Sequence, residues 1–159
     1  MKSIKLIIVF FCVIFVVNAQ ESEKQALQKL SFLIGDWQGT SISYGKDGVK
    51  KVSVTENVSY LMDGNLIQLN VKSPWIALHT IVSYNLKDKN YYYYPFTKNG
   101  NKQGYKGEVV DGKFMVYFNE SRRLTFTKTE NGEFHEFGER LVNGVWEKYF
   151  EDILQLQEK

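Results

Sequence analysis

Seven short turn signals divide the chain after residue 35 into segments in which apolar and polar residues alternate. Six of the seven pair Asp or Asn with Gly, which supplies the positive φ angle that a tight hairpin needs. The signals are Asp47-Gly48, Asp63-Gly64, Asp88-Lys89, Asn99-Gly100, Asp111-Gly112, Asn131-Gly132 and Asn143-Gly144. Hairpins that follow one another without a break predict an up-and-down antiparallel sheet.

The segments between these signals predict ten strands. They cover residues 36–44, 50–61, 65–72, 77–85, 90–97, 104–110, 113–119, 122–128, 133–142 and 145–154. An open meander would leave two unpaired edges, whereas pairing of the first strand with the last removes both. We therefore predict an all-β fold, a ten-stranded antiparallel up-and-down barrel.

A short amphipathic segment precedes the first strand. Apolar residues recur at helical spacing within residues 21–34, with Glu and Lys on the other side. Ser22 suits the N-cap position, and Gln25 follows it three residues later, as in a capping box. Gly35 is placed to end the helix. We expect a short N-terminal helix that caps one end of the barrel.

The first 19 residues have the layout of a secretory signal peptide. Lys2 and Lys5 form a basic start, an apolar run follows, and Ala19 is the small residue that a cleavage site requires. The apolar run is too short for a membrane-spanning helix. We predict that residues 1–19 are removed, that residues 20–159 form a single domain, and that the protein is exported to the periplasm or secreted.

The predicted mature chain has balanced charge and no cysteine. Of the 20 basic residues, all but Lys2 and Lys5 lie in it, against 18 acidic residues, so its net charge is zero. This balance argues against a nucleic-acid partner, which needs a basic stripe. The only cysteine, Cys12, falls in the signal peptide, so no thiolate is left for a disulfide or a metal site. We predict no metal and no cofactor.

Alternation along the strands indicates which side chains face the interior. Within residues 50–61, Glu56 shares a face with Val54 and Val58. A carboxylate on an apolar face is unusual, because burial of an unpaired charge is costly. An inner face that carries tyrosines and a few charges favours a ligand cavity over a solid core. The predicted ligand-binding residues are Glu56, Tyr60, Tyr93, Phe114, Tyr117, Phe118 and Arg140.

Glu56, Tyr117 and Arg140 are the main polar members of this set. They would fix the polar end of a ligand, with Arg140 paired to a carboxylate while the barrel is empty. Glu136 and Arg140 are four residues apart on one predicted strand and therefore share a face. A purely structural ion pair inside the barrel is equally compatible with these residues, and both interpretations stay open at this point.

The helix, the Gly-x-Trp-x-Gly motif at residues 35–39 and the ten strands together resemble the calycin superfamily. The resemblance is strongest to lipocalin-like proteins exported by bacteria, with nitrobindin-like and fatty-acid-binding-protein-like barrels as wider relatives. It implies that Trp37 packs at the closed end of the barrel, under a basic side chain for which Arg140 and Lys148 are candidates. It also implies a small, mostly apolar or amphipathic ligand.

The favoured function is binding of such a ligand inside the barrel, and enzymatic activity is not favoured. A second hypothesis is a barrel enzyme with lyase- or isomerase-type acid–base chemistry, using Glu56 and a tyrosine. A third is an interaction module whose aromatic strand, at residues 91–94, docks a partner or forms a homodimer. Haem binding ranks last, because neither His79 nor His135 clearly matches the nitrobindin-like position.

Overall fold

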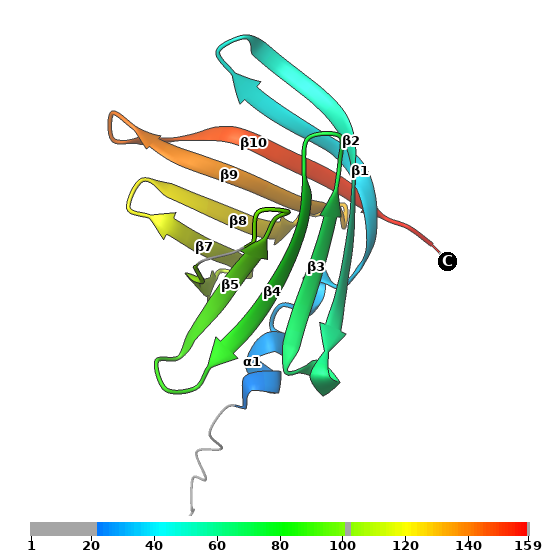
Figure 1. Cartoon of the computed structure of the whole chain (residues 1–159), viewed down its shortest axis with the longest axis vertical. Helices are drawn as coiled ribbons and strands as arrows, with labels where there is room; N and C mark the ends of the chain where they lie inside the picture. Colours follow the sequence, from blue (N-terminus) through cyan, green and yellow to red (C-terminus); the bar gives the residue numbers. More distant parts are fainter. Residues whose placement is uncertain (1–21, 101–102, 159) are drawn as a thin grey trace, which may run out of the picture.

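The computed structural model describes residues 22–100 and 103–158, so the predicted signal peptide lies outside the described residues. In that part of the chain, ten strands form a closed barrel (Figure 1). Each strand pairs antiparallel with its neighbours in the chain, and β1 also pairs with β10. The prediction of an all-β, ten-stranded up-and-down barrel is confirmed.

The predicted strands agree with the observed ones to within two residues at either end. The observed strands are β1 (Gly35–Gly45), β2 (Gly48–Leu61), β3 (Leu66–Lys72), β4 (Ala77–Asn85), β5 (Asn90–Phe96), β6 (Tyr105–Val110), β7 (Lys113–Asn119), β8 (Arg122–Lys128), β9 (Phe134–Val142) and β10 (Val145–Leu156). A 3-10 turn, η2 (Met62–Gly64), links β2 to β3. At the β9–β10 hairpin, Asn143 and Gly144 both adopt positive φ angles, 51° and 81°, as the turn chemistry predicts.

A short helix precedes the barrel, as expected. Helix α1 (Glu23–Gln28) begins at Ser22, whose hydroxyl accepts a hydrogen bond from the Gln25 backbone N–H. The Gln25 side chain accepts one from the Ser22 backbone N–H, which completes the capping box. The helix ends earlier than expected, and a 3-10 turn, η1 (Ser31–Leu33), follows it. Gly35 therefore opens β1 and does not end the helix, because the narrower 3-10 geometry already makes the connection.

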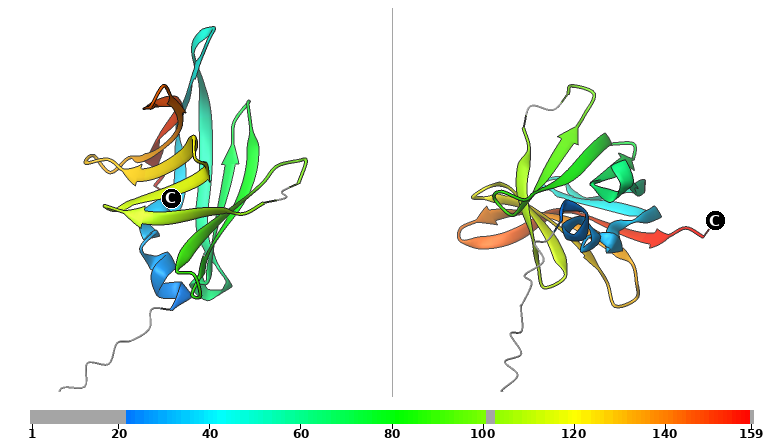
Figure 2. Two further views of the ribbon diagram at one scale, coloured as in Figure 1. Left: turned by 90° about the vertical axis from the view of Figure 1, so that its left-hand side faces the viewer. Right: turned by 90° about the horizontal axis from the view of Figure 1, so that it is seen from below.

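The helical segment closes one end of the barrel, and Figure 2 shows it from below against the strand ends. Just inside this end, Trp37 is 2% exposed. Its indole Nε1 donates a hydrogen bond of 2.8 Å to the Leu33 backbone carbonyl, and its ring centroid lies 5.4 Å from that of Phe134. The Tyr91 hydroxyl donates to the Ala26 carbonyl over 2.7 Å. Two buried hydrogen bonds therefore tie the helical segment to the strands.

A basic side chain accompanies Trp37, but it is neither of the two candidates from the resemblance. Lys128 places its Nζ 5.9 Å from the centroid of the Trp37 ring. Lys148 instead lies over Phe137 at 4.8 Å, and Arg140 is exposed. The reason is direction: β8 ends beside η1, so its last residue reaches the closed end. Arg140 and Lys148 lie near the β9–β10 hairpin, which is remote from that end.

Gly39 permits the close approach of β1 and β10. Its Cα is the register partner of Leu154, and a Cβ on Gly39 would overlap the backbone carbonyl of Ile153. A larger residue would push the two strands apart at the seam where the sheet closes on itself, so the second glycine of the motif is a condition for closure.

Trp37→Ala should lower the free energy of unfolding by about 3–5 kcal/mol, because it leaves a cavity and an unpaired Leu33 carbonyl in the closed end. Urea denaturation measures this change. Trp75→Ala is the matched control: Trp75 is 47% exposed, so its removal should cost less than about 1 kcal/mol. Equal losses for the two variants would contradict the role of Trp37 in holding the helix.

Candidate ligand-binding site

A cavity of about 520 Å³ lies in the part of the barrel away from α1. Its lining begins at Ser41 and Ser43, which lie further along β1 than the buried Trp37. The β3–β4 connection, at the opposite end from α1 in Figure 1, contributes Trp75 and Ile76 at the mouth, where they are 47% and 45% exposed. The other lining residues are Val71, Leu78, Tyr93, Pro95, Phe118, Leu124, Glu136, Tyr149, Phe150 and Asp152.

The wall formed by β9 and β10 depends on a β-bulge. The register of the two strands shifts between Lys148 and Phe150. Regular alternation would place Tyr149 and Phe150 on opposite faces, whereas the bulge lets both line the cavity. Gly138 on β9 makes room for them, because a Cβ there would overlap both rings. The bulge and this glycine thus add two aromatic rings to the wall.

Three carboxyl groups meet at the floor of the cavity. Glu136 and Asp152 line it and are direct register partners across β9 and β10. Glu56 reaches them from β2, and one oxygen of each carboxylate lies within 4.8 Å of the others. All three side chains are buried, with Glu56 only 1% exposed. We call Glu56, Glu136 and Asp152 the carboxyl cluster.

The carboxyl cluster is poorly compensated. Asp152 Oδ1 has no hydrogen-bond partner among the described residues. Among the same residues, the Glu56 oxygens have only the carboxyl group of Glu136, and a hydrogen bond between these two acids requires a proton on one of them. The ion pairs of Arg123 with Glu139 and of Lys148 with Glu151 belong to other carboxylates. An unpaired buried charge is costly, so the site needs either protons or a bound cation to become neutral.

Burial raises the pKa of all three groups. It raises the pKa of Glu56 to about 8, with the nearby Asp152 charge adding to the shift. It raises the pKa of Asp152 to about 6. The pKa of Glu136 rises well above its usual range, first through burial and then through the charges of the other two. The carboxyl cluster therefore retains protons at neutral pH, and a protonated Glu136 can donate a hydrogen bond to Glu56.

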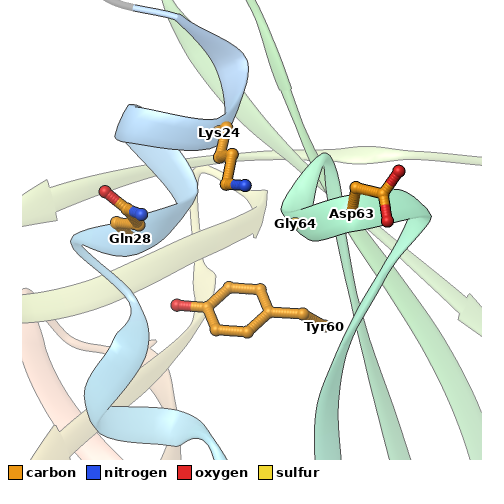
Figure 3. Close-up of a pocket in the computed structure, with 5 residues that line it drawn as sticks. All are labelled: Lys24, Gln28, Tyr60, Asp63 and Gly64. Atoms are coloured by element: carbon orange, nitrogen blue, oxygen red, sulfur yellow. The ribbon is translucent and has the colours of Figure 1, made fainter.

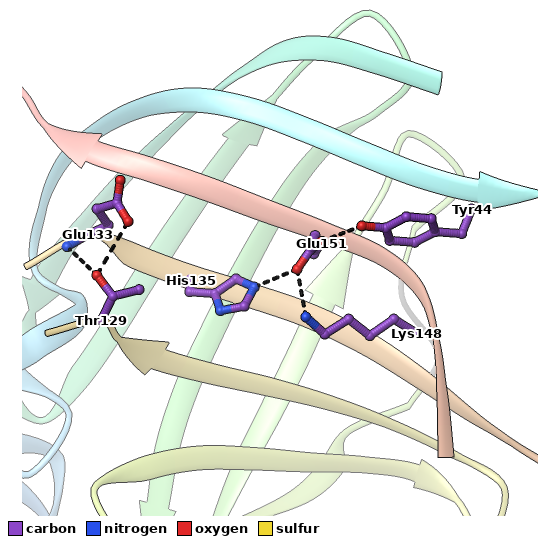
Figure 4. A network of polar contacts seen from close by, with 6 residues as sticks. All are labelled: Tyr44, Thr129, Glu133, His135, Lys148 and Glu151. Carbon is purple, nitrogen blue, oxygen red and sulfur yellow. Dashed lines mark hydrogen bonds and ion pairs between the residues drawn. The ribbon is translucent and has the colours of Figure 1, made fainter. Parts of the chain in front are cut away.

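On the outer face of the same strands, Glu151 is a partly buried acid that does have partners. Both oxygens of Glu151 are paired: the Tyr44 hydroxyl donates to one, while His135 Nε2 and Lys148 Nζ lie 2.8 and 2.7 Å from the other (Figure 4). Burial raises the Glu151 pKa, but the hydrogen bonds from Lys148, Tyr44 and His135 outweigh it and lower the pKa to about 2. Glu151 is thus a satisfied structural acid, unlike its chain neighbour Asp152.

The structure brings some of the predicted ligand-binding residues to this cavity. Tyr93 and Phe118 line it, and Glu56 belongs to the carboxyl cluster at its floor. Phe114 also points inward but lies in the solid part of the core, fully buried, with its ring 5.5 Å from that of Phe126.

Tyr60 and Tyr117 lie elsewhere. Tyr60 is near α1, where it borders a separate pocket of about 440 Å³ (Figure 3). The other residues around that pocket are Lys24, Gln28, Asp63 and Gly64. Tyr117 faces outward from β7, and its hydroxyl donates a 2.7 Å hydrogen bond to Glu108. Neither tyrosine borders the cavity that holds the carboxyl cluster.

Arg140 is exposed near the β9–β10 hairpin, where its register partner is Glu147. The expected pairing of Arg140 with a carboxylate inside the barrel is therefore not found among the described residues. Alternation along the strand predicts whether the Arg140 side chain faces inward or outward. It does not predict how far along the barrel axis Arg140 lies. Four residues along a strand span roughly 13 Å, and this distance carries Arg140 past the cavity that Glu136 lines.

The two histidines and the outward tyrosines of β5 also lie outside the cavity. His79 is exposed, with Nδ1 2.6 Å from Asn70 Oδ1, and His135 contacts Glu151 on the outer face. Tyr92 and Tyr94 stack on the outer face of β5 with ring centroids 6.1 Å apart. Haem binding and partner docking stay predictions.

Sequence reasoning missed the carboxyl cluster as a group, although each member carries the same signal. Each acid lies two residues from apolar or small neighbours on its own strand face, which are Val54 and Val58, Phe134 and Gly138, and Phe150 and Leu154. That pattern drew attention to Glu56 alone. Applied to every strand, it would also have indicated Glu136 and Asp152.

Comparison with protein-family models finds no match, and comparison with curated protein sequences finds none either. No helix among the described residues is both long enough and apolar enough to cross a membrane. Strand order and register therefore carry the assignment of the fold, a closed antiparallel barrel compatible with a calycin-like architecture.

The stability of the empty protein should fall as the pH rises from 5 to 9. The pKa values of the carboxyl cluster are higher in the folded state than in the unfolded state, so the folded state keeps protons that the unfolded state has lost. This stabilisation is complete below the unfolded pKa of about 4. It is lost as the pH rises through about 6 for Asp152 and about 8 for Glu56. Urea denaturation at pH 5, 7 and 9 should show a loss on the order of a few kcal/mol.

Two variants test the source of that loss. Glu56→Gln should flatten the dependence, because an amide carries no charge at any pH, whereas Glu130→Gln in the exposed β8–β9 turn should keep it. The lowered pKa of Glu151 has the opposite sign, but its contribution is complete by pH 5. A wild-type stability that stays constant or increases between pH 5 and 9 would contradict the raised pKa values.

Proposed function

We propose that this chain is an exported lipocalin-like protein that binds a small, largely apolar ligand inside its barrel. The observation that carries the proposal is the 520 Å³ cavity with its mostly apolar and aromatic lining. Ligand pockets of proteins usually measure about 300–1,000 Å³ and combine such walls with a few polar groups. Export is inferred from the signal-peptide pattern of residues 1–19.

The mouth of the cavity supports a binding role. Trp75 and Ile76 are large apolar side chains that are nearly half exposed beside the opening. Exposed apolar groups next to a cavity lower the cost of entry for an apolar molecule, because its surface can leave water in stages. Inside, Phe118, Leu124 and Phe150 offer apolar surface on three strands.

Acid–base catalysis is a second candidate, favoured by the raised pKa values of the carboxyl cluster. A general base works best with a pKa near the operating pH, and Asp152 at about 6 satisfies this condition at the cavity surface. Glu56, the base that the sequence indicates, lies behind Glu136 and Asp152 and does not line the cavity. Binding is preferred because it needs only the cavity itself.

A fluorescent probe tests the binding function. N-phenyl-1-naphthylamine is neutral at pH 7 and apolar, and it should bind one molecule per chain with micromolar affinity and enhanced fluorescence. Ser43→Trp should abolish this binding, because Ser43 lines the cavity and an indole there would fill it.

Ser53→Trp is the matched control, since Ser53 is exposed on the outer face of β2 and its replacement leaves the cavity open. Circular dichroism checks that both variants are folded. Absence of probe binding to the wild type, or equal binding by both variants, would refute a ligand cavity at this place.

A further inference from the structure

We propose that the ligand carries a cationic nitrogen, and that its ammonium group binds the carboxyl cluster while its apolar body fills the cavity. The inference rests on the proposed binding function and specifies its ligand class: an amphipathic amine. It starts from three buried acids at one end of an apolar cavity, with no basic side chain against them among the contacts of the described residues.

The carboxyl cluster has unused hydrogen-bonding capacity. Asp152 is 5% exposed, lines the cavity, and has an oxygen, Oδ1, without a partner among the described residues. Behind it, the buried Glu56 accepts no hydrogen bond among the described residues except one from a protonated Glu136. Buried polar atoms nearly always have partners, so unpartnered acceptors that face a cavity indicate a donor that arrives with the ligand. An ammonium group brings three N–H donors and one positive charge.

The cavity walls next to the cluster are aromatic. Tyr93, Tyr149 and Phe150 line the same cavity as Glu136 and Asp152. Aromatic faces attract cations, and the attraction increases where water is excluded. Acidic groups at the floor and aromatic rings on the wall are therefore complementary to an ammonium group. The remaining apolar wall is complementary to an alkyl or aryl body attached to it.

An organic cation fits this site better than a metal ion. Hard divalent cations take six or more oxygen ligands, and their carboxylate ligands are usually held by further hydrogen bonds. Apart from a hydrogen bond with Glu136, another member of the cluster, the Glu56 oxygens have no such support among the described residues. Beyond the cluster, the only oxygen donors among the described side chains that line the cavity are neutral hydroxyls, those of Ser41, Ser43, Tyr93 and Tyr149, and the rest of the lining is apolar.

Other charged and titratable groups near the cluster do not neutralise it. The guanidinium of Arg122 lies over the Tyr149 ring, 5.2 Å from its centroid, and acts on that tyrosine. The Ser41 hydroxyl hydrogen-bonds Asp152, and Tyr93 is held neutral by burial. On the outer face, His135 contacts Glu151, and its electrostatic effect lowers the pKa of Asp152 by less than burial raises it. An incoming ammonium therefore replaces the protons of the cluster, and its binding should strengthen as the pH rises from 5.5 to 8.5.

Isothermal titration with octylamine and 1-octanol tests the inference, because the two probes differ only in the polar end. At pH 8.5, octylamine should bind at least about tenfold more tightly than 1-octanol. Its advantage should shrink at pH 5.5, where the cluster keeps its protons and the amine stays charged. The double variant Glu136→Gln, Asp152→Asn should remove the advantage yet still bind N-phenyl-1-naphthylamine. Glu130→Gln, which removes one exposed charge, should leave the preference for octylamine over 1-octanol unchanged.

The outcomes separate this inference from the function on which it rests. Equal affinities for the two octyl probes, with N-phenyl-1-naphthylamine bound, would overturn the amine and keep the apolar cavity. Binding of none of the three probes would overturn both. Stoichiometric binding of Ca²⁺ or Mn²⁺ without binding of octylamine would overturn the amine in favour of a metal site. If the double variant does not fold, the pH dependence of the wild-type preference decides: a preference that is the same at both pH values overturns the inference.

Discussion

The pairing of β1 with β10 is the contact on which the rest of the molecule depends. Without it, β2 and β10 would lie far apart in an open sheet, and Glu56 could not meet Asp152. Closure places β1 between them, so that Trp37 is the register partner of Glu56 and Ser41 that of Asp152. The same act that removes two sheet edges therefore encloses the cavity and assembles its acidic floor.

Local chemistry explains why the fold could be predicted so closely. Each hairpin is specified by two or three adjacent residues, as at Asn143-Gly144, and each strand by its own alternation. The carboxyl cluster is not local: Glu136 and Asp152 pair across one hairpin, but Glu56 is 80 residues from Glu136 and meets them only after closure. The depth of Arg140 depends on where β9 leaves the barrel, and Tyr149 reaches the cavity through a bulge. Neither the exit point nor the bulge has a signal in the alternation of residues.

Glu151 and Asp152 show that proximity of partners decides the state of a buried acid. They are adjacent in the chain, and both are mostly shielded from water. Glu151 faces outward into Tyr44, His135 and Lys148, and its pKa falls to about 2. Asp152 faces inward, and its pKa rises to about 6. Burial alone does not raise the pKa of an acid when basic partners are close, as Glu151 shows. The raised pKa of Asp152 therefore reflects the absence of such partners among the described residues on the cavity side of β10.

The two ends of the barrel differ: the closed end is solidly packed, and the other end holds the cavity for which we propose ligand binding. At the closed end, Phe114, Phe126 and Phe134 stack in series beneath Trp37, and the helical segment is tied down by buried hydrogen bonds. This packing can offset the destabilisation that uncompensated acids cause at the other end, because the antiparallel ladder joins both ends in one sheet. A cation that neutralises the acids would then stabilise the folded state in proportion to its affinity. If the proposed ligand binds there, binding and stability are coupled through the same three carboxyl groups, and a ligand that lacks the charge would fill the cavity without neutralising them.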